Sequence, residues 1–181
     1  DWQMLFVTLG GFSAIILGWL SIRQPETLAH RRPVTVSHLS EAFQMVLTNE
    51  RSLRFTLAAG ISFGGLVSYL SSAQHIFQDV YQTGEWFPVL FGSTAASIAI
   101  SSLVNANYVR RFGMETICRI AFGVQILWSA FFLALYANGD PISLIAWLVY
   151  IVPVLFLMGL TFANLQSVAL EPMGAIAGTA S

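Results

Sequence analysis

The stretch Ile142-Ser-Leu-Ile-Ala-Trp-Leu-Val-Tyr-Ile-Val-Pro-Val-Leu-Phe-Leu-Met-Gly-Leu160 decides the fold class. It holds no charged residue, and at about 1.5 Å per residue it can cross a hydrocarbon core of about 30 Å as a helix. A helix satisfies all the backbone polar groups of one segment inside lipid, whereas a single strand does not. Segments of about ten alternating residues, typical of membrane β-barrels, are not seen. The stretch therefore predicts a transmembrane helix.

Four further stretches have the same apolar character. We expect residues 4–22, 55–72, 86–104 and 117–136 to span the membrane. Another span begins near Ala175 and is cut short at Ser181, and the chain starts at Asp1 rather than at a methionine. We therefore expect an excerpt from a longer protein.

Composition leads to the same class. Of the 181 residues, 56% are hydrophobic and only 9% are charged, where a soluble domain carries about 25% charged residues. This excludes a soluble enzyme, a nucleic-acid binder and a disordered chain. Cys118 is the only cysteine, which excludes an internal disulfide and a thiolate metal cluster. The sequence predicts an all-α, polytopic membrane protein with no cofactor.

The arginines predict the orientation in the membrane. All eight basic residues are arginines, and they lie in the connection 23–54 or around the connection between the spans 86–104 and 117–136. The other two connections, residues 74–85 and 137–141, have none. The positive-inside rule places the arginine-bearing connections in the cytoplasm.

The long connection 23–54 contains a second helical pattern. Its apolar residues recur with helical spacing at Leu39, Ala42, Phe43, Val46 and Leu47. This pattern fits a short amphipathic helix on the membrane surface. A linker helix packed under the bundle fits it equally well.

Three motifs together carry a family resemblance. They are Arg23-Gln-Pro-Glu-Thr-Leu28, Asn105-Ala-Asn-Tyr-Val-Arg-Arg-Phe-Gly113, and the segment 163–181 with Ala-Leu-Glu-Pro followed by Ala-Gly-Thr-Ala-Ser. The chain resembles the major facilitator superfamily, specifically its Bcr/CflA-like drug:proton antiporters. The resemblance implies a fold of twelve helices in two halves. Residues 1–22 would then be the last helix of the N-terminal half, residues 23–54 the cytoplasmic inter-half loop, and residues 55–181 an incomplete C-terminal half of four spans plus the start of a fifth.

The resemblance also implies a function. It is that of a secondary active transporter, not an enzyme, which couples protons to the efflux of small amphiphilic drugs across the inner membrane of a bacterium. The implied partners are the drug, protons, the lipid bilayer and the remainder of the same chain, with no nucleic acid. A structural or receptor-like helical bundle without transport is the alternative.

The same resemblance makes the spans 55–72 and 142–160 part of the wall of a central cavity. Aromatic side chains offer contact area to an amphiphilic drug, and hydroxyl or amide groups orient it. The candidate cavity residues are Phe63, Tyr69, Gln74, Tyr150, Thr161 and Asn164. Helical spacing places Tyr150, Thr161 and Asn164 on one face. A plain packing role for Tyr69 and Tyr150 is the alternative.

The connection after the span 86–104 resembles a degenerate copy of the family's cytoplasmic loop motif. Arg111 and Gly113 match the motif, whereas Arg110 stands where the family has an aspartate. We expect a tight turn there, and a gating latch between Glu171 and Arg110 or Arg111. The alternatives are that the arginines serve only as topology signals and that Glu171 is simply solvated.

Helix packing and flexibility have their own signals. Pro153 interrupts the hydrogen bonds of its span and predicts a hinge, or else a tolerated proline. Gly60-x-x-x-Gly64, Gly92-x-x-x-Ala96 and the stripe Ser93, Ser97 and Ser101 predict close approach of helix backbones.

Proton coupling is expected in the other half of the protein. The interiors of the four spans of residues 55–160 hold no Asp, Glu, Lys or Arg, and coupling requires a group that changes charge within the cavity. His75 lies near the outer end of its span, and Glu171 lies beyond the end of another.

Overall fold

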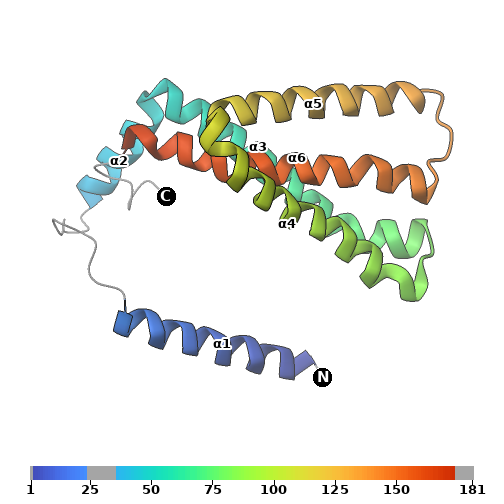
Figure 1. Cartoon of the computed structure of the whole chain (residues 1–181), viewed down its shortest axis with the longest axis horizontal. Helices are drawn as coiled ribbons and strands as arrows, with labels where there is room; N and C mark the ends of the chain where they lie inside the picture. The colour runs from blue at the N-terminus through green and yellow to red at the C-terminus, as the bar shows by residue number, and fades with distance from the viewer. Residues whose placement is uncertain (1, 24–35, 174–181) are drawn as a thin grey trace. The chain divides into compact units, whose positions relative to one another are not determined.

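A computed structural model describes residues 2–23 and 36–173, and it divides the chain into two units, residues 1–35 and 36–181. Figure 1 shows the helices of both units, which we describe separately. The further span predicted near Ala175 lies outside the described residues.

The described residues of the first unit form one helix, α1 (Trp2–Arg23). Its side chains are exposed all round, as they would be in lipid. The hydroxyls of Thr8, Ser13 and Ser21 each donate to the backbone carbonyl four residues earlier, so these three hydroxyls are satisfied within the helix. The helix extends the predicted span 4–22 only slightly at both ends.

The second unit is a bundle of helices joined by short connections. Its elements are α2 (Val36–Thr48), α3 (Glu50–Gln74), the π-helical turn η1 (His75–Val80), the 3-10 turn η2 (Gly84–Trp86), α4 (Phe87–Phe112), α5 (Met114–Leu135), α6 (Leu144–Leu170) and the 3-10 turn η3 (Glu171–Met173). With α1, the described residues contain five helices that are long and apolar enough to cross a membrane. The predicted fold class, a polytopic all-α bundle, is confirmed for the described residues.

The long connection after the first span is shorter than we predicted. We expected it to run to residue 54, but α3 begins at Glu50, and α2 occupies residues 36–48. The Asn49 side chain accepts a hydrogen bond from the Ser52 amide at 3.0 Å and so caps α3. Hydropathy misses these first residues because they are charged, although they are fully helical.

Gly113 makes the tight turn that its motif predicted. It is the single residue between α4 and α5, and its φ of 79° lies in a region that favours glycine. Its amide donates to the Val109 carbonyl and closes the end of α4. With so short a connection, α4 and α5 must run in opposite directions.

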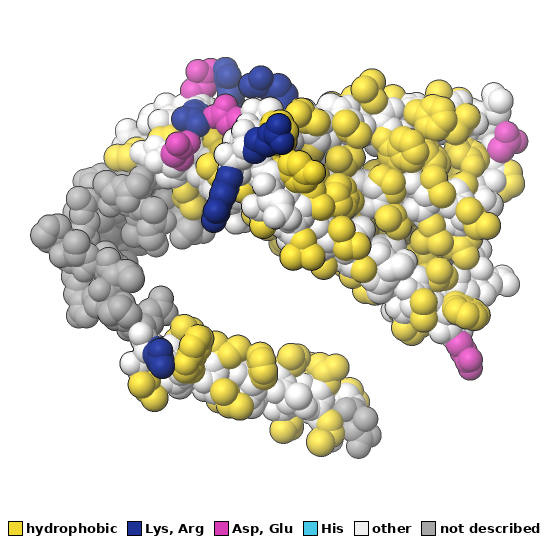
Figure 2. Space-filling view, in the orientation of Figure 1, with side chains coloured by type: hydrophobic (Ala, Val, Ile, Leu, Met, Phe, Trp, Pro, Cys, Tyr) yellow, Lys and Arg dark blue, Asp and Glu magenta, His cyan; other side chains and the backbone are white. Residues whose placement is uncertain are grey.

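Successive long helices α3 to α6 alternate in direction (Figure 1). The starts of α3 and α5 and the ends of α4 and α6 therefore lie together. We call this part of the bundle the arginine end, because it carries Arg51, Arg54, Arg110, Arg111 and Arg119. Figure 2 shows the dark blue arginines gathered there, while yellow hydrophobic side chains cover the rest of the visible bundle. The grouping of arginines is as the sequence predicted.

Helix α6 is the centre of the bundle and packs against α3, α4 and α5. Its buried side chains include Leu155, Leu165 and Val168, each at most 1% exposed. Gly159 permits the closest approach, since a Cβ atom there would lie 2.0 Å from Ser101 Oγ on α4.

The small-residue predictions were partly wrong. A Cβ atom added at Gly60, Gly64 or Gly92 would meet nothing within 4 Å among atoms outside its own helix. Ser97 and Ser101 are buried as predicted, at 5% and 0% exposed. The critical glycine is instead Gly159, which belongs to none of the predicted pairs, because only its partner helix shows that it is needed.

Candidate functional site

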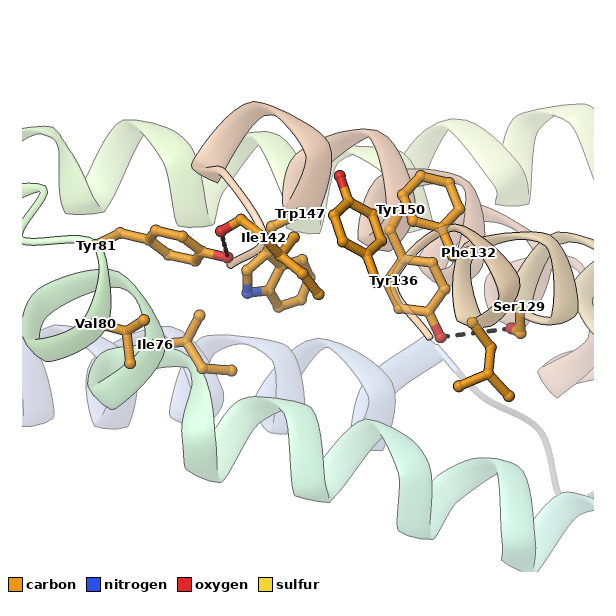
Figure 3. Close-up of a pocket in the computed structure, with 10 residues that line it drawn as sticks. Ile76, Val80, Tyr81, Ser129, Phe132, Tyr136, Ile142, Trp147 and Tyr150 are labelled. Carbon is orange, nitrogen blue, oxygen red and sulfur yellow. Dashed lines mark hydrogen bonds between the residues drawn. The ribbon is translucent and has the colours of Figure 1, made fainter. Parts of the chain in front are cut away.

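An aromatic cavity lies at the end of the bundle opposite the arginine end. Its volume is about 520 Å³. It is lined by Ile76, Val80, Tyr81, Ser129, Phe132, Leu133, Tyr136, Ile142, Trp147 and Tyr150. Figure 3 shows these side chains coming from the π turn η1 and the residue after it, from α5, from the connection between α5 and α6, and from α6. A volume of this size suits a small organic molecule.

The π-helical turn η1 shapes one wall of this cavity. Its extra residue per turn changes which face the end of α3 presents, and such turns are frequent at functional sites. Phe77 is buried at 0% exposed and stacks on Trp147, with ring centroids 6.3 Å apart. Its neighbours Ile76 and Val80 line the cavity. The turn thus buries Phe77 against Trp147 and places Ile76 and Val80 on the cavity wall.

Hydroxyl groups supply the polarity of the aromatic cavity. Tyr81 Oη donates to the Ile142 carbonyl at 3.1 Å, and Tyr150 Oη lies 3.4 Å from Ser129 Oγ (Figure 3). Burial raises the pKa of Tyr81, and nearby Tyr136 raises it further. The Tyr81 phenol therefore stays neutral at pH 7, and no lining residue carries a charge. The cavity can stack and hydrogen-bond a ligand but cannot form an ion pair with it.

Of the predicted cavity residues, Tyr150 alone lines this space. Tyr69 lies nearby but is part-buried among helices: its hydroxyl is 2.6 Å from Thr94 Oγ1 on α4, and its ring packs edge-on against Trp147. Gln74 is exposed. The geometry is that of a packing residue for Tyr69 and of a surface residue for Gln74.

Thr161 and Asn164 do not share an open face with Tyr150. They are 0% and 3% exposed. Asn164 Nδ2 donates to Asn105 Oδ1 at 2.7 Å, and the Asn105 amide donates back at 3.3 Å. Helical spacing correctly predicted that the three residues share one face of α6. It could not predict that α4 covers the part of this face that carries Asn164. In the described structure Asn164 joins α6 to α4, while the Thr161 hydroxyl donates to the Met158 carbonyl of its own helix.

Phe63 lies in a different groove, between α3 and α6. The groove has a volume of about 390 Å³, and Thr56, Gly60, Phe162 and Gln166 are among its lining residues. Phe63 packs on Phe162 with ring centroids 5.9 Å apart. Of the six predicted cavity residues, Tyr150 and Phe63 therefore line two different spaces, and the other four line neither of them.

The arginine end holds the predicted gate residues, but the contacts differ from our prediction. The Glu171 carboxylate lies 2.8 Å from Arg51 Nη2, and not against Arg110 or Arg111. The same nitrogen atom lies 2.6 Å from Glu115 Oε1. The predicted latch partner was thus wrong, because the start of α3 comes closer to the end of α6 than the α4–α5 turn does.

Arg110 and Arg111 are both exposed, and neither forms an ion pair within the described part of the chain. The Arg111 guanidinium lies 5.4 Å from the centroid of the Phe112 ring. Pro153 lies inside α6, which continues unbroken from Leu144 to Leu170. The hinge at Pro153 stays a prediction.

Sequence reasoning missed two groups of site residues. We interpreted Arg51 only as a topology signal. Its position two residues after the cap Asn49 could have placed it in the first turn of α3. Phe132 lies on α5 with Tyr136 four residues later at its C-cap, whereas Trp147 lies on α6, and no spacing along the chain joins the two helices. Only the packing of α5 on α6 brings these rings together.

Comparison of the sequence with known proteins identifies the family. The sequence profile of the Major Facilitator Superfamily matches residues 1–181. The chain belongs to this superfamily. It is a multi-pass membrane protein, as the resemblance of its motifs predicted.

A curated relative of this chain is the "Bicyclomycin resistance protein homolog" of Haemophilus influenzae (strain ATCC 51907 / DSM 11121 / KW20 / Rd). The two are 27% identical over 188 aligned positions, which cover 99% of this chain and 46% of the relative. The chain thus spans about half the length of that relative. This agrees with the resemblance to Bcr/CflA-like members. No solved structure matches the chain.

Proposed function

We propose that the chain is part of a secondary transporter that exports small amphiphilic drugs across the inner membrane of a bacterium in exchange for protons. One observation carries the proposal: the superfamily match extends over the whole chain, and a relative that matches 99% of it is named for resistance to a drug. A structural or receptor-like bundle would share the helices but would not confer resistance.

The aromatic cavity supports amphiphilic compounds as substrates. Its walls are aromatic and aliphatic, and its polar groups are uncharged hydroxyls. Aromatic rings bind a ligand by stacking and by burying apolar surface, and hydroxyl groups orient it by hydrogen bonds. The Phe63 groove offers a similar surface with one amide, that of Gln166. We propose that the drug contacts α3 and α6 through these two spaces.

The proposed coupling site lies in the remainder of the protein. In the described bundle, the acidic groups Glu50, Glu115 and Glu171 are at the arginine end, and Asp79, Glu85 and Asp140 lie near the opposite end. A coupling carboxylate works by burial within the cavity, where its protonation changes with the transport cycle. The remaining chain would supply that group and the opposite cavity wall.

Drug export by the full-length protein tests this proposal. Cells that express it should survive higher bicyclomycin concentrations than cells with an empty vector. They should also accumulate less drug, and an uncoupler should abolish the difference in accumulation. Unchanged accumulation for every amphiphilic drug tested, with the protein present in the membrane, would favour a bundle without transport. Export that persists with the uncoupler would contradict proton coupling.

A further inference from the structure

One guanidinium group at the arginine end holds two carboxylates from two other helices. Arg51 of α3 approaches Glu115 of α5 at 2.6 Å and Glu171, directly after α6, at 2.8 Å. Both contacts are made by the same atom, Nη2. Two like charges are therefore held within reach of one nitrogen.

No other cation shares this task within the described residues. Arg54 pairs with Glu50 of its own helix. Arg119 lies one turn after Glu115, yet no ion pair joins them. Without Arg51, the carboxylates of Glu115 and Glu171 would face each other uncompensated, and like charges at short range repel.

The backbone beside Arg51 is fixed in place. The Ser52 hydroxyl, which is 0% exposed, donates to the Ala169 carbonyl at 2.7 Å. The Asn49 side chain caps the same turn. The start of α3 is thus attached to the end of α6 before any charge is considered, and the Arg51 side chain extends from this fixed point to α5.

Helix α5 depends on Arg51 for its attachment to α3. Helix α6 packs along α3, α4 and α5, but α3 and α5 make few contacts with each other. A groove between them, lined by Arg54, Phe55, Cys118 and Arg119 among others, runs next to Glu115. The Arg51–Glu115 pair closes α3 onto α5 beside this groove.

We propose that Arg51 is a positioning residue that holds the ends of α3, α5 and α6 together by pairing with both Glu115 and Glu171, which reduces the repulsion between the two carboxylates. Its role is to let these three helix ends move as one body during transport. The proposal depends on charge balance, and it differs from a simple packing role in one respect. Removing both carboxylates together with the arginine should restore the closed arrangement.

Cys118 offers a direct reporter of this arrangement. It is 3% exposed, lies on α5 less than one turn after Glu115, and lines the groove between α3 and α5. Separation of α3 from α5 would expose its thiol. The rate of its alkylation by N-ethylmaleimide is measured in native membranes, in the full-length protein with Cys118 as its only cysteine.

We expect Arg51→Gln to raise the alkylation rate about fivefold, the scale of a partly exposed ion pair. Arg51→Lys should stay close to the parent, because an ammonium group keeps the charge. The matched control is Arg54→Gln, which removes the same charge from the same helix but breaks only a pair within α3. This control should label at the parent rate.

The decisive variant is Arg51→Gln with Glu115→Gln and Glu171→Gln. It should label near the parent rate, because the repulsion is gone. An unchanged rate in Arg51→Gln, an equal rise in Arg54→Gln, or a triple variant as fast as Arg51→Gln would overturn the proposal. If Arg51→Gln does not accumulate in the membrane, accumulation of the triple variant supports charge compensation, and loss of both overturns it. Drug export is not the readout, so failure here leaves the proposed function standing.

Discussion

Gly159 of α6 lies so close to α4 that a Cβ atom on it would stand 2.0 Å from Ser101 Oγ and 3.2 Å from Ser101 Cβ. Ser101 is fully buried, and its hydroxyl donates to the Ile98 carbonyl of its own helix at 2.7 Å. The two helices approach at this point because neither residue fills the gap. Gly159 therefore sets the spacing of α4 and α6.

Replacing Gly159 by alanine should lower the stability of the bundle by about 1–3 kcal/mol, the usual cost of overpacking. A thermal melt of the purified protein in detergent measures this loss. Gly64→Ala is the matched control, since no atom outside its own helix lies within 4 Å of an added Cβ. Adding Ser101→Gly to Gly159→Ala should recover part of the loss. Equal melting temperatures for Gly159→Ala and Gly64→Ala would contradict this spacing role.

The paired amides of Asn105 and Asn164 should be coupled energetically. Removing Asn105 leaves the buried Asn164 amide with only its bond to the Leu160 carbonyl, and removing Asn164 takes away the partner of Asn105; a buried polar group that loses a hydrogen bond is costly. We expect Asn105→Ala and Asn164→Ala each to destabilise the protein. The double variant should lose less than the sum, with a coupling of about 0.6–2 kcal/mol. A melting series on the four proteins gives this number, and strict additivity would show that the pair contributes nothing.

Tyr150 and Tyr69 should respond differently to substitution by alanine. Tyr150 lines the aromatic cavity, so its loss should change which drugs are exported more than it changes protein abundance. Tyr69 is bonded to Thr94 and packed among rings, so its loss should reduce the folded protein and leave the drug profile of what survives unchanged. Susceptibility to a panel of drugs, normalised to membrane abundance, separates the two effects. A changed profile in Tyr69→Ala with normal abundance would return Tyr69 to the cavity wall.

Phe63→Ala shows which of the two spaces the drug uses. Phe63 is 51% exposed and lines the groove between α3 and α6. If the drug passes there, the variant should alter the drug profile as Tyr150→Ala does. The same panel provides the measurement, and Phe43→Ala on α2, also exposed at 68%, is the control. A normal profile for Phe63→Ala would leave the aromatic cavity as the drug-contacting space.

The arginine end should face the cytoplasm. Single cysteines placed at Arg110 or within residues 82–85, in a full-length protein without Cys118, should differ in their reaction with an impermeant thiol reagent. The positive-inside rule predicts labelling from outside for residues 82–85 only. Labelling of position 110 from outside intact cells would reverse the topology.

Proton coupling should survive loss of either titratable side chain that lies near the ends of the spans. His75 pairs with Asp79 at 2.7 Å on an exposed surface, and Glu171 pairs with Arg51. Neither is buried in a cavity, so His75→Asn and Glu171→Gln should each leave proton-driven drug export measurable in membrane vesicles. Loss of coupling in either variant, with the protein folded and still binding drug, would place the coupling site in this part of the chain.

The helices, the grouping of the arginines and the turn at Gly113 could all be predicted from the amino-acid sequence. These follow from local causes, namely apolar segments long enough for a bilayer, charges that stay outside it, and a glycine at a single-residue connection. Residues 50–54 were misplaced for the same reason, since hydropathy marks the edge of the lipid and not the end of a helix.

Which residues contact one another depends on how the helices pack. Thr161 and Asn164 share a helical face with Tyr150, yet α4 covers that face at one level and leaves it open at another. Glu171 finds Arg51, which is 120 residues away, and Gly159 is required only because Ser101 stands opposite. The physical reason is that helix propensity and hydropathy act within a segment. Burial, charge pairing and close approach, by contrast, depend on which neighbour packs against each face.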